Sequence, residues 1–151
     1  MITRKETVSN LSERSIGGVY AGNRIACQLS LEVIRTILED HLLDRTVAIG
    51  QLLERRFLLM KKKYNVIGDV HGLKVLTAVE LVKDRDVKEP ATQETEKIVK
   101  YCVQNGFLFQ MAESIKNVLR VLVSLVVTDE QLEETLDVVE EGMIKINHNN
   151  Q

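Results

Sequence analysis

The chain has 151 residues, of which 44% are hydrophobic and 28% charged, and its formal net charge is −2. This composition is typical of one globular domain with its own core, and the balanced charge gives no electrostatic basis for binding nucleic acid or an anionic membrane. No apolar run reaches the roughly 18 residues of a membrane span, and the polar N-terminus shows no secretory signal. Cys27 and Cys102 lie far apart, so we expect reduced thiols in a cytoplasmic protein.

The first half of the chain predicts an irregular arm and two helices. Residues 1–22 are polar and end in a glycine-rich turn. Asn23 is a good N-cap, and apolar residues at helical spacing predict a helix over 23–39. A second helix is predicted over about 40–63; it ends in three lysines, and cations favour a helix C-terminus. The basic residues at this end could form a nucleic-acid patch, but a solvated helix end is the commoner explanation.

The second half of the chain alternates strand and helix patterns. We predict, in order, strands at 66–70 and 73–82 joined at Gly72, a helix at 92–104, and strands at 107–111 and 118–127. Thr128 and Gln131 have the spacing of a capping box for a last helix, whose apolar residues form one stripe. This order predicts an α/β (α+β) fold, with a small mixed sheet of about four strands and helices on one face.

The common catalytic and cofactor-binding motifs do not occur in this sequence. It contains no GxSxG, HExxH, P-loop or GxGxxG pattern. His41, His71 and His148 are scattered, so no metal site is predicted. From the residues alone, the chain is a globular α/β domain without an assigned function.

One residue in the stretch 117–131, NVLRVLVSLVVTDEQ, stands out. Arg120 lies in a run that is otherwise almost wholly apolar and rich in β-branched residues. A guanidinium is always charged and costly to bury without an anionic partner. Arg120 therefore pairs with an internal carboxylate, faces water on an edge strand, or binds a carboxylate or phosphate from outside.

This stretch also carries a resemblance to a known family. NVLRVLVSLVVTDEQL resembles the C-terminal signature of class III pyridoxal-phosphate (PLP) aminotransferases, and it is most similar to the 4-aminobutyrate aminotransferase branch. Three further stretches match in the same order: GGVYAGN at 17–23, VIGDVHG at 66–72 and AVELVKD at 78–84. The resemblance covers nearly the whole chain but only about the last third of a family member.

The resemblance implies a division of the chain. Residues 1–22 are similar to the arm and glycine-rich turn at the end of the family's large domain. Residues 23–39 are similar to its interdomain helix. Residues 40–151 are similar to the small C-terminal domain of fold-type I aminotransferases.

The resemblance also implies a function. Family members bind PLP on a lysine of the large domain and move an amino group from an amino acid to a 2-oxo acid. By position, Arg120 matches the arginine that binds the substrate carboxylate. Val19 stands where the family has a threonine that contacts the cofactor phosphate, and valine lacks the hydroxyl. The implied substrates are 4-aminobutyrate, or a related ω-amino acid, with 2-oxoglutarate.

No lysine of this chain stands in the context of the family's catalytic lysine. We therefore expect the chain alone to be inactive and to hold no PLP, and to act as a homo-oligomer or with a complementary large-domain chain. Two alternatives stay open at this point, a free-standing dimerisation or interaction module and a decayed fragment without a catalytic role. Leu29, Val33 and Ile37 on the first helix would be the residues that pair two copies.

Overall fold

The first unit of the structure contains one described helix, α2. The computed structural model describes residues 6, 9, 18, 22–112 and 115–149, and it separates into two compact units, Met1–Asp40 and His41–Gln151. Helix α2 spans Arg24–Glu39. The Oδ1 atom of Asn23 accepts hydrogen bonds from the backbone N–H groups of Ile25 at 2.9 Å and Ala26 at 3.3 Å, which confirms the predicted N-cap. No residue of α2 is buried.

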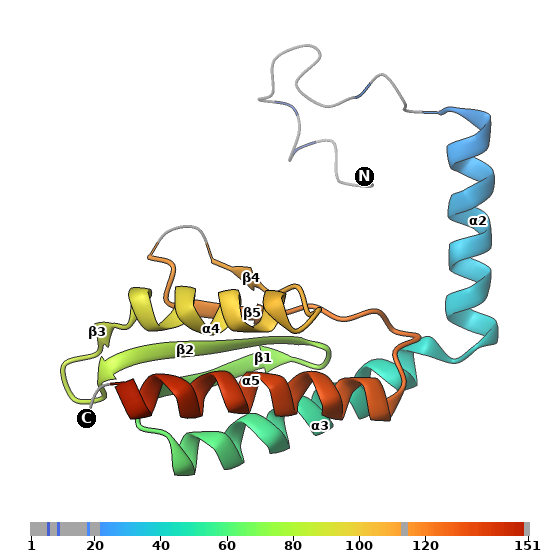
Figure 1. Cartoon of the computed structure of the whole chain (residues 1–151). Helices are drawn as coiled ribbons and strands as arrows, with labels where there is room; N and C mark the ends of the chain where they lie inside the picture. Colours follow the sequence, from blue (N-terminus) through green and yellow to red (C-terminus); the bar gives the residue numbers. More distant parts are fainter. Residues whose placement is uncertain (1–5, 7–8, 10–17, 19–21, 113–114, 150–151) are drawn as a thin grey trace. The chain divides into compact units, whose positions relative to one another are not determined.

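The second unit is a five-stranded sheet with three helices (Figure 1). Its elements are α3 (Leu42–Lys63), β1 (Ile67–Leu73), β2 (Leu76–Asp84), β3 (Glu89–Pro90), α4 (Thr92–Gln104), β4 (Gln110–Met111), β5 (Val118–Val121) and α5 (Asp129–Asn149). The strand order is β1-β2-β5-β4. The short strand β3 lies outside this order and pairs with β2. The predicted α/β fold class is confirmed.

We predicted a sheet of mixed strand direction, but all described strand pairs are antiparallel. The reason is that β1 and β2 form a hairpin, and β5 turns back along β4 before it inserts beside β2. β5 therefore runs against both of its neighbours. The first hairpin turns at residues 74–75 rather than at Gly72, since Leu73 and Leu76 are the pair that closes it.

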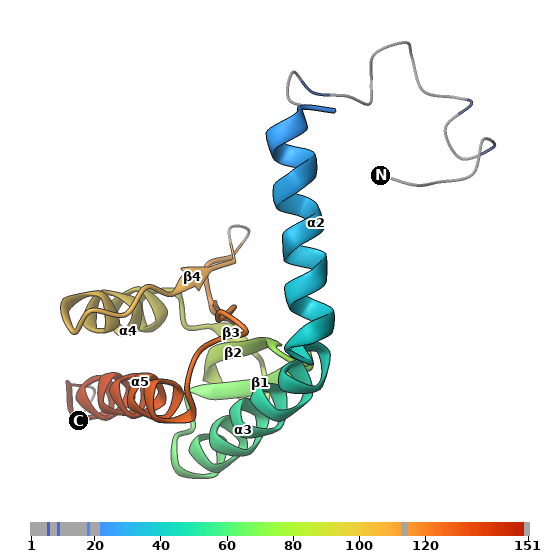
Figure 2. The same ribbon diagram turned by 90° about the vertical axis from the view of Figure 1, so that its right-hand side faces the viewer.

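One face of the sheet forms the core of this unit. Alternate residues of a strand point to opposite faces, and the alternating buried residues of the two central strands are Thr77, Val79, Leu81, Leu119 and Val121. Figure 2 shows α4 and α5 side by side on the same side of the strands. The apolar stripe of α5 is buried as predicted, through Leu132, Leu136, Val139, Met143 and Ile146. Within the described residues of this unit, no helix lies over the opposite face of the two central strands (Figure 2).

Strand β5 is much shorter than the predicted strand over 118–127. The chain leaves the sheet after Val121, and a turn begins at Ser124. The backbone N–H of Val127 donates to the Ser124 carbonyl at 3.2 Å, and that of Val126 donates to Ser124 Oγ at 3.4 Å. Thr128 and Gln131 then exchange reciprocal hydrogen bonds at 3.1 and 3.2 Å, which confirms the predicted capping box.

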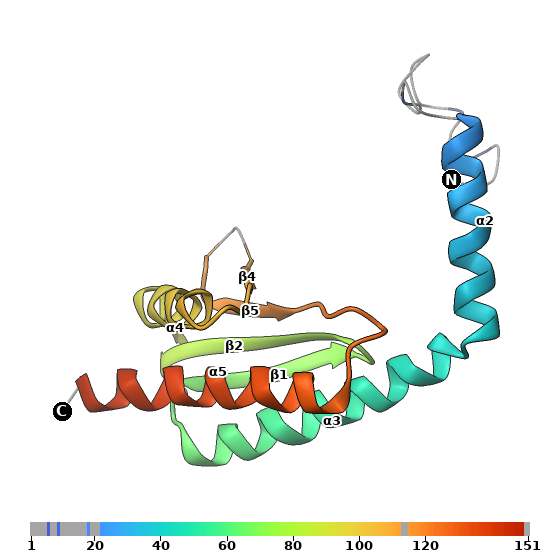
Figure 3. The ribbon, with the colours of Figure 1, turned by 45° about the vertical axis from the view of Figure 1, so that its right-hand side comes forward.

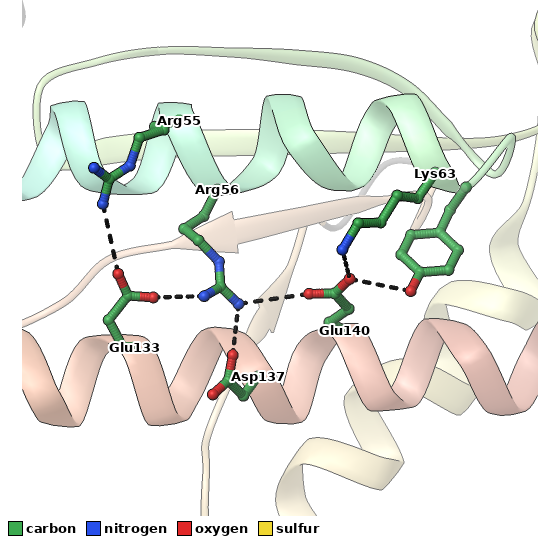
Figure 4. A network of polar contacts seen from close by, with 7 residues as sticks. Arg55, Arg56, Lys63, Glu133, Asp137 and Glu140 are labelled. Carbon is green, nitrogen blue, oxygen red and sulfur yellow. Dashed lines mark hydrogen bonds and ion pairs between the residues drawn. The ribbon is translucent and has the colours of Figure 1, made fainter.

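A polar network joins α3 to α5, which run alongside each other (Figures 3 and 4). Arg56 contacts Glu133 at 2.7 Å and Asp137 at 2.6 Å. Lys63 and the Tyr64 hydroxyl both donate to Glu140, at 2.8 and 3.1 Å. These cations are paired with carboxylates of the neighbouring helix, so they do not form a free basic patch.

The C-terminal end of α3 is capped by a distant side chain. Arg85 donates from Nη2 to the carbonyls of Lys61 at 2.6 Å and Tyr64 at 2.9 Å. Its Nε donates to the carbonyls of Asn65 at 3.2 Å and Ile67 at 3.1 Å. A cation at this position satisfies carbonyls that have no partner within the helix and complements the helix dipole.

Helix α3 also crosses the β1–β2 turn in close backbone contact. A Cβ atom built on Gly50 would lie 2.4 Å from both the carbonyl carbon and the carbonyl oxygen of Lys74. Such distances are far below van der Waals contact, so only glycine fits at this crossing.

Candidate functional site

Strand β5 places Arg120 on the open face of the sheet. Leu119 and Val121 point into the core and are 0% and 2% exposed. The alternation of a strand therefore turns Arg120 to the opposite face, where its side chain is exposed. Its neighbours across the two ladders are Ala78 of β2 and Gln110 of β4. The small Ala78 side chain leaves room above the sheet for the guanidinium.

The surroundings of Arg120 bear on the three explanations of its place in the sequence. β5 lies between β2 and β4, so Arg120 is not on an edge strand. Within the described residues, no carboxylate comes within the 4.0 Å of an ion pair with its guanidinium. The exposed guanidinium is therefore able to stay hydrated or to bind an anion from outside.

Two hollows meet at Arg120. One, of about 370 Å³, is lined by residues 107–110 and 120–124 together with Val127 and Thr135. The other, of about 460 Å³, is lined by Arg120 and residues 110–112. Leu108 and Leu122 at the first hollow are 89% and 67% exposed, so its rim is strongly apolar. The site thus combines one cation with an apolar wall, which suits a carboxylate that carries a short carbon chain.

Hydrogen bonds to β2 and α4 hold the start of β5 in place. Asn117 is 3% exposed, and its Nδ2 donates to the Leu81 carbonyl at 3.0 Å. The backbone N–H of Leu81 donates in return to the Asn117 carbonyl at 2.8 Å. The Thr92 hydroxyl of α4 donates to the carbonyl of Ile115 at 2.9 Å. Our sequence reasoning gave Asn117 no role, although a buried amide beside a strand is a usual way to fix a register.

The residues that line the two hollows do not fit PLP on their own. PLP needs a lysine for its Schiff base, a carboxylate for its ring nitrogen and donors for its phosphate. Neither hollow is lined by a lysine, an aspartate or a glutamate. Val19, which we matched to the phosphate-binding threonine, lies outside the described residues. The lining of these two hollows therefore offers a guanidinium, from Arg120, but none of the charged groups that PLP requires.

Neither a cluster of metal-ligating side chains nor a membrane-spanning helix occurs among the described residues. Its histidines, cysteines and carboxylates do not gather into any group that could hold a metal ion. None of its helices combines the length and the apolar character that crossing a membrane demands.

The fold of the chain is shared with solved transaminases. A transaminase from the marine bacterium Virgibacillus superposes with a TM-score of 0.81 and 20% identity, over 97% of this chain and 34% of that one. An amine transaminase from an uncultivated Pseudomonas species, solved in its PLP-bound form, superposes with a TM-score of 0.77 and 21% identity. That match covers 88% of this chain and 30% of the transaminase. The class of fold is therefore that of the fold-type I transaminases.

The sequence places the chain within that class. The family model for class-III aminotransferases matches residues 1–143, and the chain belongs to this family. A probable 4-aminobutyrate aminotransferase of Bacillus subtilis is 34% identical over 95% of this chain and 33% of its own length. The 4-aminobutyrate aminotransferase GabT of Escherichia coli is 35% identical, over 90% of this chain and 32% of its own length. The chain thus spans about a third of the length of these relatives.

Proposed function

We propose that the chain acts as the small C-terminal domain of a class III aminotransferase, in which Arg120 binds the carboxylate of the amino-acid substrate. The observation that carries this proposal is the exposed guanidinium on the open face of a central strand, with no carboxylate at ion-pair distance in the described residues. A planar guanidinium can bind a carboxylate through two parallel hydrogen bonds.

In this proposal the large domain supplies the cofactor site. A partner large domain, from the same protein or a second chain, holds PLP and its lysine, and this chain alone does not catalyse transamination. The substrate is 4-aminobutyrate or a related ω-amino acid, with 2-oxoglutarate as the acceptor, because the relatives that resemble the chain include 4-aminobutyrate and 5-aminovalerate aminotransferases. We place the protein in the cytoplasm, since Cys27 and Cys102 are free thiols.

The role of Arg120 can be tested in a chimaera that joins this chain to the large domain of the Bacillus subtilis relative. Hydrogen bonds to a charged group contribute about 1.5–3 kcal/mol, so Arg120→Ala is expected to raise KM for 4-aminobutyrate about 10- to 150-fold. Arg55→Ala is the control, because this arginine is 67% exposed and lies on α3, outside both hollows. An unchanged KM in Arg120→Ala would refute the assignment.

The surface of α2 favours a second candidate function, a homodimerisation module. Six large apolar side chains of this helix are more than half exposed: Ile25, Leu29, Leu31, Val33, Ile34 and Leu38. Exposed apolar surface of this extent promotes association. Sedimentation of the chain as a monomer at high concentration would refute this alternative.

A further inference from the structure

The cross-strand neighbour of Arg120 on β4 is a second polar group at the same site. Gln110 and Arg120 are partners in the antiparallel ladder between β4 and β5. The backbone N–H of Ala112 donates to the Val118 carbonyl at 3.1 Å. Because hydrogen-bonded pairs alternate along such a ladder, Gln110 and Arg120 are the next hydrogen-bonded pair, with Cα atoms about 5.5 Å apart. Their side chains stand on the same face with Cβ atoms about 4.5–5.5 Å apart.

Both side chains are exposed, and both line the two hollows described above. Within the described residues, neither side chain makes a hydrogen bond to another protein group. On the other side of Arg120, the cross-strand neighbour is Ala78, which has no polar side-chain atom. Gln110 is therefore the described residue best placed to share a ligand with the guanidinium.

The chemistry of a glutamine suits this position. Its side chain carries an acceptor, Oε1, and a donor, Nε2. Oε1 can accept an N–H of the guanidinium and so hold it in one orientation, while Nε2 can donate to a carboxylate that the guanidinium binds. A guanidinium alone has donors only and a flexible side chain, so a neighbouring amide adds a hydrogen bond and lowers the entropic cost of ordering the arginine.

We propose that Gln110 and Arg120 form a two-residue carboxylate clamp, in which Gln110 is a positioning residue and a second donor to the ligand. The proposal rests on the carboxylate-binding role given to Arg120 above and adds a residue to it. The ligand is an organic monocarboxylate or dicarboxylate whose carbon chain lies along the apolar wall at Leu108 and Leu122.

The test is an NMR titration of the isotope-labelled full chain with 4-aminobutyrate, followed at the Arg120 Nε–H and Gln110 side-chain amide resonances. Butylamine, which lacks the carboxylate, is the ligand control. We expect both resonances to shift and to saturate with one Kd, and butylamine to leave them unchanged. A Gln110 amide that does not respond while Arg120 does would overturn the clamp, and so would the absence of saturable shifts at both groups.

Three variants separate the clamp from the role of Arg120 alone. Gln110→Met keeps the length of the side chain without its hydrogen bonds, and it should weaken binding about 2- to 10-fold. Gln110→Glu places a carboxylate opposite Arg120, and it should weaken binding more than Gln110→Met does, because the new carboxylate competes for the guanidinium and repels the ligand. Gln93→Glu makes the same charge change at an exposed residue of α4 and should leave Kd unchanged.

The binding constants of these variants distinguish failure of the clamp from failure of the role proposed for Arg120. If Arg120→Ala leaves Kd unchanged, the carboxylate-binding role of Arg120 fails and the clamp fails with it. If Arg120→Ala abolishes binding while Gln110→Met and Gln110→Glu bind as the unaltered chain does, only the clamp is wrong. The melting temperature of each variant is measured in parallel, and a variant that binds weakly while melting normally supports a role in binding rather than in folding.

Discussion

The contact between Gly50 of α3 and the β1–β2 turn predicts that replacing this helical glycine by alanine lowers stability, whereas such a replacement usually raises it. Alanine in the interior of a helix is normally more stable than glycine by about 1 kcal/mol. At Gly50, however, the added Cβ would lie 2.4 Å from backbone atoms of Lys74, which cannot rotate away. Overpacking costs about 1–3 kcal/mol, and a backbone obstacle places this case at the upper end. We therefore expect Gly50→Ala to destabilise the chain by a net amount of about 2 kcal/mol.

The assay is thermal unfolding followed by circular dichroism, with Gly142→Ala as the matched control. A loss of about 2 kcal/mol should lower Tm by about 6–10 °C in a unit of this size. Gly142 is also inside a helix, α5, but its added Cβ would lie 3.3 Å from Cδ1 of Tyr101, a side chain that can shift. Gly142→Ala should therefore leave Tm unchanged or raise it slightly. If Gly50→Ala raised Tm as well, α3 would not cross the turn as closely as described.

Two further predictions concern Arg85 and the cysteines. Arg85→Ala should lower the free energy of unfolding by about 1–2 kcal/mol in a denaturant titration, because carbonyls at the end of α3 lose their donor, whereas Arg85→Lys should recover only part of the loss. Equal stability of Arg85→Ala and the unaltered chain would refute the capping role. Burial raises the pKa of the Cys102 thiol to about 11, so at pH 8 iodoacetamide should label the exposed Cys27 and reach Cys102 only after unfolding. Labelling of both at similar rates in the folded chain, read by mass spectrometry, would contradict the buried position of Cys102.

Much of the fold follows from local signals that the sequence shows directly. Asn23 and the Thr128–Gln131 pair are capping residues whose partners lie within three positions along the chain, so their hydrogen bonds were predictable. The apolar stripe of α5 was predictable for the same reason, because helical spacing determines which side chains share a face. Strand ends were less predictable, since the turn at Ser124 competes with a β-branched run that favours a longer strand.

In the candidate site, too, the residue with a local sequence signal was predictable and the residue that depends on tertiary structure was not. Arg120 was visible as a charge within an apolar strand, because residue type alone makes it unusual. Gln110 was not, because an exposed glutamine has no unusual property until the ladder places it opposite Arg120. Arg85 was missed for a similar reason, since its hydrogen bonds reach carbonyls 18 to 24 residues earlier in the chain. Pairings of this kind depend on tertiary structure and leave no periodic signal.

The position of β5 in the sheet has a consequence for the order of folding. The β1–β2 hairpin closes through a two-residue loop and can form locally within about 1–10 μs. β5 instead inserts between β2 and β4, and its first contact with β2, between Leu81 and Asn117, spans 36 residues. Closing a loop of that length costs conformational entropy and makes this step slower. We therefore expect the strand that carries Arg120 to complete the sheet late in folding, so that a growing or partly unfolded chain does not yet hold Arg120 and Gln110 opposite each other.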